Sequence, residues 1–377
     1  MTVPPPPNQW GPQPPTGQQA GGPQWGQPPQ WGPQQGWGPP PGPPPSGGGK
    51  GKWVLAGIAL LAVIAVTVVI TVLVVGKDSG GGESPTPTNG NGSDFASAND
   101  KGPVGIVTED PTCDSWSRVG TALSAVEDKV AWASRDRSIP ANDWTSQQRT
   151  MYETVAKAMT EAADQTVGLV KLTPHRVMRE LYEQFIAYAR TFADSIQTYT
   201  ANDSHLAGAV DSISSAPGDI CGAATYGPAA SQAPLIPAPA TPSKFSAIGD
   251  PSNPQRFLAA SNPVCAEWLS AYGQLLTDTA AWRAIDPNIP ATQWTPDQKA
   301  VVDAVSPVME AFADKSEALG QRSSNPTFED FALLSAQYRR AYVLTFPTYT
   351  SADDYLVSAS TSLAMAVNAA CSAVQDR

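Results

Sequence analysis

Four cysteines are the residues of this sequence whose chemistry depends most directly on their spacing: Cys113, Cys221, Cys265 and Cys371. A thiol can act as a nucleophile, bind a metal ion or form a disulfide. Structural zinc sites use paired CxxC cysteines or nearby histidines, and these cysteines have neither. All four follow an apolar segment that is long enough to cross a membrane, and disulfides persist in the oxidising compartment beyond it. The cysteines are therefore predicted to form two disulfides and no metal site.

Tryptophans form the candidate binding surface. The pattern Ile-Pro-Ala-x-x-Trp-Thr occurs twice, at residues 139–145 and 289–295. In one interpretation each tryptophan precedes a helix cap and stacks on a cation, Arg149 or Lys299, where an apolar staple partner is usual. In the alternative interpretation an aromatic shelf binds an apolar or sugar-like ligand. The tryptophans of this candidate site are Trp132, Trp144, Trp282 and Trp294.

Two arginines complete the set of candidate binding residues. Arg190 corresponds to Arg340, and Asp164 corresponds to Asp314, when the chain is aligned with itself at an offset of 150 residues. If arginine and aspartate meet across neighbouring helices, an ion pair that fixes the helix register is expected. The alternative is that each arginine anchors a ligand.

Catalysis has little support in the sequence. The only histidines, His175 and His205, correspond to Asn325 and Tyr355, so no histidine-based site is repeated. No HExxH metal motif and no glycine-rich phosphate loop occur. We expect no catalytic residue, no cofactor and no enzymatic activity; a hydrolase with paired carboxylates stays the open alternative.

The elements that must position these residues are helices, repeated once. At the same offset, Cys221 falls on Cys371 and residues 139–145 fall on 289–295. Apolar residues recur at helical spacing, for example at Leu181, Phe185 and Tyr188. The predicted fold is all-α, a duplicated four-helix bundle. The predicted boundaries are helical repeat 1 at residues 111–222, a Pro/Ala/Ser-rich linker at 223–262 and helical repeat 2 at 263–377.

The helix ends are also predicted by local signals. Capping boxes start helices after Thr145 and Thr295, and Pro347 should end a helix while Pro307 should kink one. The helices expected in the first repeat are 113–136, 145–170, 174–197 and 203–221. In an up-down bundle of four helices the start of the first and the end of the fourth lie at the same end. Bridges within each repeat, Cys113–Cys221 and Cys265–Cys371, are therefore the natural pairing of the three that are possible.

The first 110 residues have a different composition. Residues 1–52 are rich in Pro, Gly, Gln and Trp and are predicted to be a disordered arm. The uncharged run at 53–76 is predicted to be a transmembrane helix, and 77–110 a flexible stalk. Lys50 and Lys52 precede the run, so the positive-inside rule places the N-terminus in the cytoplasm and the repeats outside a single-pass plasma membrane protein.

The N-terminal repeats of Gln-Trp-Gly-Pro, the Gly-Gly-Gly-Lys-Gly-Lys before the apolar run and the Ala-rich exported region resemble proline-rich single-pass membrane proteins of the mycobacterial and actinobacterial cell envelope. The resemblance implies a place in that envelope and transfers no site residue. With a net charge of −11 the chain is not expected to bind nucleic acid. We expect a non-enzymatic protein whose outer repeats bind an envelope protein or a lipid-like ligand while the arm recruits another partner inside. The alternative is a carrier of a lipid or glycan precursor.

Overall fold

The structure is a computed structural model, and it describes residues 94–375, which lie within one compact unit. No strand occurs among these residues, so the expected all-α class is confirmed. The arm at 1–52 and the transmembrane helix at 53–76 lie outside the described residues. One described stretch, Ser351–Gln375, is apolar and long enough to span a membrane, but 61% of its apolar window is buried inside the domain. Its apolar composition is therefore explained by its place in the core of the domain.

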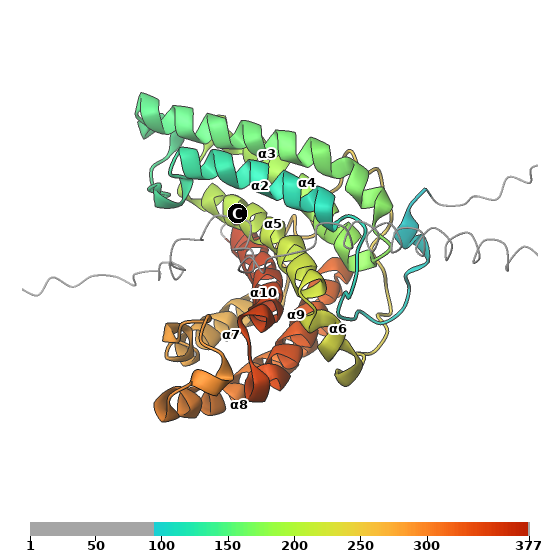
Figure 1. Cartoon of the computed structure of the whole chain (residues 1–377). Helices are drawn as coiled ribbons and strands as arrows, with labels where there is room; N and C mark the ends of the chain where they lie inside the picture. Colours follow the sequence, from blue (N-terminus) through green and yellow to red (C-terminus); the bar gives the residue numbers. More distant parts are fainter. Residues whose placement is uncertain (1–93, 376–377) are drawn as a thin grey trace, which may run out of the picture. The chain divides into compact units, whose positions relative to one another are not determined.

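Four long helices occupy each half of the described chain, and they pack mainly on their sequence neighbours (Figure 1). The first half contains α2 (Cys113–Lys129), α3 (Ser146–Leu172), α4 (Arg176–Ser195) and α5 (Ser204–Thr225). The short helix α6 (Pro228–Gln232) follows. The second half contains α7 (Cys265–Asp278), α8 (Pro296–Arg322), α9 (Pro326–Thr345) and α10 (Asp354–Gln375).

Local signals set the helix ends. The side chains of Thr145 and Thr295 each accept a hydrogen bond from the backbone N–H three residues later. The side-chain oxygen of the glutamine there accepts from the backbone N–H of the threonine, so both capping boxes are confirmed. α9 ends two residues before Pro347, as expected. α8 continues through Pro307 as one helix.

The first predicted helix was too long. α2 ends at Lys129, seven residues before the expected end at 136. Ala131 takes a left-handed conformation with φ of 53°, which breaks the helix and turns the next residue inward. The side chain of Trp132 then lies in the core, only 3% exposed, which explains why the chain leaves the helix at this point.

Both predicted disulfides are present. Cys113 is bonded to Cys221, and Cys265 is bonded to Cys371. Each bridge joins the start of the first long helix of its half to the last long helix, α2 to α5 and α7 to α10. The bridges therefore close each half on itself.

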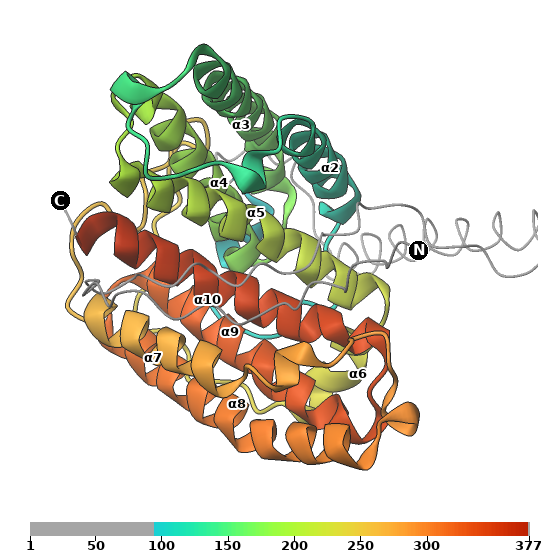
Figure 2. The same ribbon diagram turned by 90° about the vertical axis from the view of Figure 1, so that its left-hand side faces the viewer.

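The two halves meet chiefly where α5 lies along α10, the most extensive helix pair of the domain (Figure 2). The contact is close because small residues line it. A Cβ added to Gly222 would lie 2.2 Å from the ring of Tyr355, so only glycine fits there. The same ring stacks on Tyr226 at 5.1 Å between centroids. Nearby, the Ser362 hydroxyl donates a hydrogen bond of 2.7 Å to half-buried Asp219.

Two segments predicted to be loose are instead part of the core. The stalk was expected to extend to residue 110, but Val104 and Val107 are buried, and the hydroxyl of Tyr338 accepts from the backbone N–H of Val107 at 3.3 Å. The expected linker 223–262 includes the end of α5 and all of α6. Its Phe257 also packs between Tyr188 and Phe331. Apolar side chains spaced along both segments hold them on the helices, although their Pro- and Gly-rich composition is typical of loose chain.

Removal of one disulfide should lower the free energy of unfolding without changing the fold. The Cys113→Ser, Cys221→Ser double variant opens a loop of 108 residues. A loop of that size corresponds to about 2–5 kcal/mol of lost stability. Equilibrium denaturation monitored by circular dichroism measures the change. The Cys265→Ser, Cys371→Ser variant is the matched control, since its loop of 106 residues should cost a similar amount. Unchanged stability in both variants would contradict the structural role.

Candidate functional site

The residues expected to bind a ligand are partly in the core. Trp132 and Trp144 are both buried, and both rings contact Tyr152, at 4.9 and 4.0 Å between centroids. The guanidinium of Arg149 lies 5.7 Å from the ring of Trp144, which is the ring–cation contact expected for the staple. In the first half, therefore, the motif has the geometry of the structural interpretation.

The corresponding residues of the second half are less covered. Trp282 and Trp294 are half-buried, and their rings contact Tyr342 and Tyr349 respectively. The indole N–H of Trp294 donates to the carbonyl of Ile289 at 3.0 Å, as that of Trp144 does to Ile139. The two copies of the motif thus close the same turn, and ligand binding at these tryptophans stays a prediction.

The predicted arginine–aspartate pairs are confirmed as contacts. Arg190 lies 2.6 Å from Asp164, and Arg340 lies 2.7 Å from Asp314. Arg340 also contacts Glu317 at 2.9 Å. Each pair ties the third long helix of its half to the second near the surface, which fits a register contact between helices.

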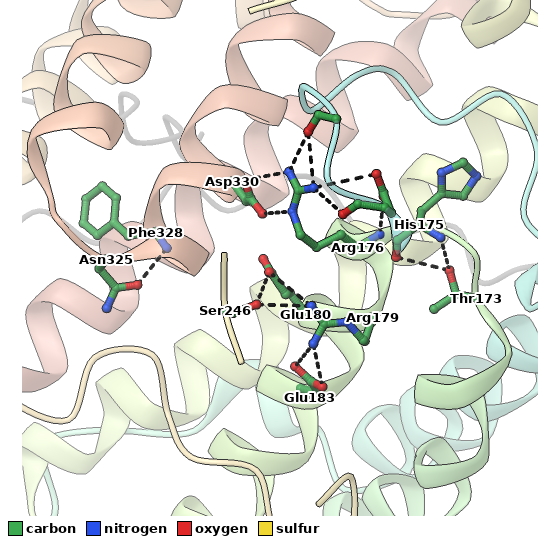
Figure 3. A network of polar contacts seen from close by, with 12 residues as sticks. Thr173, His175, Arg176, Arg179, Glu180, Glu183, Ser246, Asn325, Phe328 and Asp330 are labelled. Carbon is green, nitrogen blue, oxygen red and sulfur yellow. Dashed lines mark hydrogen bonds and ion pairs between the residues drawn. The ribbon is translucent and has the colours of Figure 1, made fainter. Parts of the chain in front are cut away.

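A larger polar feature, not foreseen from the sequence, lies where α4 meets α9 (Figure 3). Arg176, the first residue of α4, is 3% exposed and places Nε 2.6 Å and Nη2 3.2 Å from the two carboxylate oxygens of Asp330 on α9. One turn further along α4, Arg179 donates to Glu183 at 3.0 Å and to Ser246 at 3.2 Å. We call Arg176, Arg179, Glu180, Glu183 and Asp330 the buried ion cluster.

Glu180 completes the buried ion cluster. It is fully buried, and the hydroxyl of Ser246 donates to it. Burial raises the pKa of Glu180 well above the ordinary value, and the nearby charge of Asp330 raises it further. Burial also raises the pKa of Asp330, although Arg176 opposes this effect. The guanidinium of Arg179 lies 3.6 Å from the Glu180 carboxylate, and both arginines oppose the rise in its pKa.

The N-terminal segment is bound to this cluster. The carboxylate of Asp100 accepts from the backbone N–H of Arg176 at 2.6 Å, and Arg176 Nη1 donates to the Asp100 carbonyl at 2.7 Å. His175 directs a ring nitrogen to the carbonyl of Glu109 at 2.9 Å. The first described residues thus bind to the start of α4.

A hollow of about 640 Å³ opens beside the cluster, and we call it the basic pocket. Its walls come from residues 97–101, from residues 243–248 and from the first turns of α4 and α9. Four of the chain's 23 basic residues line it, with a single acidic residue, Asp100. The four are Lys101, Arg176, Arg179 and Lys244.

One signal in the sequence could have revealed the cluster. Arg176, Arg179, Glu180 and Glu183 follow the i, i+3, i+4, i+7 spacing of a single helix face. Charged residues in that pattern usually face solvent, and here the face is covered by α9 and by residues 243–248. Glu180 is matched by the carboxylate of Asp330 at the 150-residue offset, whereas Arg176 is matched by Pro326. Loss of the positive charge of Arg176 in the second copy, beside a carboxylate kept in both copies, distinguishes this face from an ordinary solvated helix face.

Fold and site together define an all-helical domain with two internal disulfides and a basic pocket over a buried ion cluster. Comparison with known proteins gives the family. Residues 95–375 match the family described as mycobacterial ESX-1 associated protein, and the chain belongs to it. A relative, an uncharacterized protein of Mycolicibacterium smegmatis (strain MKD8), is 45% identical over 331 residues, covering 86% of this chain and 87% of the relative. No solved structure matches the chain. The expected relation to mycobacterial proteins is therefore confirmed, and the single-pass, proline-rich membrane character stays a prediction.

Removing one partner from the buried ion cluster should lower the free energy of unfolding far more than removing one partner of a surface ion pair. Asp330→Ala leaves Arg176 buried without its carboxylate, and such a change lowers the free energy of unfolding by about 3–5 kcal/mol. Asp314→Ala, which removes an exposed partner of Arg340, should cost less than about 1 kcal/mol. Chemical denaturation of both variants measures the difference. Equal effects would show that the Arg176–Asp330 pair is not an essential contact.

Stability should fall as the pH rises from about 4 to about 8. Burial raises the pKa of Glu127 to about 8, of Asp219 to about 7 and of Asp354 to about 6. A carboxyl whose folded-state pKa is raised is neutral in the fold at low pH. Its contribution is lost as the pH rises through that pKa. Thermal unfolding across this range measures the slope.

Asp219→Asn should flatten that pH profile, because the amide stays neutral and still accepts from Ser362. For a pKa moved from 3.8 to about 7 the difference is roughly 4 kcal/mol at most. The matched control is Glu310→Gln on the exposed surface, which should leave the slope unchanged. A profile equally steep in Asp219→Asn would refute the assignment.

Proposed function

We propose that this chain is a non-enzymatic, membrane-anchored component of ESX-1 secretion. Its helical domain would lie outside the cytoplasmic membrane and bind a protein of the secretion apparatus or envelope there. The segment 53–76 would form the single anchor, and the arm 1–52 would recruit a second partner in the cytoplasm. The family description supports the link to secretion, since residues 95–375 match proteins described as ESX-1 associated.

The pair of disulfides is the observation that carries the proposed location. Both halves of the domain are closed by a bridge, and every cysteine of the chain is used. Such bridges form and persist in oxidising compartments and are rare in a reducing cytoplasm. The positive-inside bias of Lys50 and Lys52 supports the same orientation.

Binding, and not catalysis, is supported by the way the charged residues are used. Arg176, Arg179, Glu183 and Asp330 bond mainly to one another and to the segments that cover them. His175, one of the two histidines, lies 2.9 Å from a backbone carbonyl and stands at the start of α4. These contacts hold segments in place, as expected for a rigid binding domain.

The carrier alternative has less support. It would be favoured by an apolar cavity beside Trp132 and Trp282. The ring of Trp132 contacts Tyr152 and Phe192, at 4.9 and 6.0 Å between centroids, so aromatic side chains fill the space in the first half. Trp282 contacts Tyr342 at 5.8 Å. We therefore retain partner binding as the proposed function.

Crosslinking in cells tests this proposal and the orientation together. A membrane-impermeant amine crosslinker, added to intact cells that express the full chain, should join the domain to a partner through lysines such as Lys157 and Lys299, which are exposed. A permeant crosslinker should in addition join Lys50 or Lys52 to a cytoplasmic protein. Mass spectrometry identifies the adducts.

The matched control is a chain that lacks residues 1–49 and keeps both lysines before the anchor. It should lose the cytoplasmic adducts and keep the outer ones, because the disulfide-bonded domain is separate along the chain from the arm. Impermeant reagent that fails to reach the domain in intact cells would contradict the proposed location. An outer domain that yields no protein adduct with either reagent would contradict partner binding.

A further inference from the structure

Two lysines that line the basic pocket have no acidic partner among the described residues. Arg176 is paired with Asp330 and Asp100, and Arg179 is paired with Glu183. Within residues 94–375, no ion pair involves Lys101 or Lys244, and both lysines are exposed. Two ammonium groups therefore remain to attract an anion into this hollow of an otherwise acidic chain.

Helix ends add to this charge. α4 begins at Arg176 and α9 begins at Pro326, and both residues line the pocket. Each helix has 20 residues, and the N-terminus of a helix carries partial positive charge that favours anions. Asp100 already accepts from the backbone N–H of Arg176, and the side chain of Asn325 accepts from the N–H of Phe328. The two helix starts therefore contribute their partial charge and not these N–H groups.

Two buried polar groups in the pocket wall lack partners. Ser97 is 3% exposed and Arg179 is 2% exposed, and both line the pocket. The hydroxyl of Ser97 and the Nε–H of Arg179 make no hydrogen bond within the described residues. A buried donor without an acceptor costs about 1–3 kcal/mol, so such groups usually mark a place where a ligand or an ordered water completes the site.

The pocket also offers an apolar wall and small hydroxyl groups. Phe245 and Ile248 line one side, and the ammonium of Lys101 lies 5.8 Å from the ring of Phe245. Ser243 contributes a further hydroxyl. A volume of about 640 Å³ accommodates a headgroup with a short apolar extension, which is the usual size of a small-molecule site.

We propose that the basic pocket binds a phosphate-type oxyanion headgroup through Lys101 and Lys244, with the partial positive charge at the starts of α4 and α9 adding to the attraction. The group can belong to a free phosphorylated metabolite or to an anionic phospholipid. The second source is within reach, because about 20 residues separate the predicted membrane helix from residue 97, and such a stretch extends to at most about 70 Å. The inference goes beyond the proposed function and does not depend on which protein the domain binds.

Hydrogen exchange with mass spectrometry on the full chain tests the site. The chain is placed in nanodiscs of phosphatidylcholine and titrated with inorganic phosphate or glycerol phosphate, against chloride at equal ionic strength. Exchange should slow in residues 97–101 and 243–248. In the Lys101→Ala, Lys244→Ala variant the concentration needed should rise about tenfold, since two exposed charge contacts are lost. The control is Lys157→Ala, Lys299→Ala, which removes two exposed lysines far along the chain from the pocket and should leave the titration unchanged.

A second experiment distinguishes a lipid headgroup from a free phosphorylated metabolite. Nanodiscs that contain phosphatidylglycerol, without added phosphate, should protect the same two segments if the headgroup belongs to a lipid. Protection by soluble phosphate alone would assign the site to a free metabolite. The proposal would be overturned if neither experiment slowed hydrogen exchange in these segments. It would also be overturned if both lysine variants weakened the response to phosphate equally. Neither result would alter the crosslinking test, so the two proposals fail separately.

Discussion

The close packing of α5 against α10 is the constraint on which the rest of the domain depends. Small residues let the two helices approach, and Gly222 leaves room for the ring of Tyr355. Each of these helices carries one end of a disulfide, so α2 is tied to α5 and α7 is tied to α10. The two halves are thus positioned through one helix pair, and the other helices are placed relative to it. A larger residue at position 222 would separate the halves and everything attached to them.

The two halves of the domain also meet where α4 contacts α9, and charged side chains are buried there. The contact of α4 with α9 is smaller than that of α5 with α10, but it contains the Arg176–Asp330 ion pair. Buried ion pairs contribute little net stability compared with apolar packing, yet an unmatched partner is costly. The pair therefore selects one arrangement of α4 against α9. It also orients Arg176 so that the N-terminal segment can bind through Asp100.

Short-range features of this structure could be predicted from the sequence. The capping boxes at Thr145 and Thr295 depend on residues three positions apart, and the disulfide pairing followed from the number of helices. Features that depend on distant partners could not be predicted. The charged face of α4 resembles a solvated surface until α9 is known to cover it, and the cover comes from residues about 150 positions away.

The two ordered connections show the same limit. Residues 94–110 and 223–262 are rich in residues typical of loops, and their few apolar side chains give no helical or strand period. Val107 and Phe257 are held because complementary sites exist on α9 and α4. The basic pocket was missed for the same reason, since its walls come from both connections and from two helix ends.

The attachment of residue 100 to Arg176 has a mechanical consequence. Tension that reaches the domain along the chain from its N-terminal side acts on residues 95–100, which pack on α3 and α4. Asp100 is bonded to α4 and, through Arg176, to α9. Such a load is shared between the two halves instead of peeling one terminal helix away. Because Cys113 follows thirteen residues later and is bonded to α5, any extension that breaks the first contact is stopped at a covalent bond. These contacts and the disulfide therefore oppose force applied at the N-terminal side of the domain.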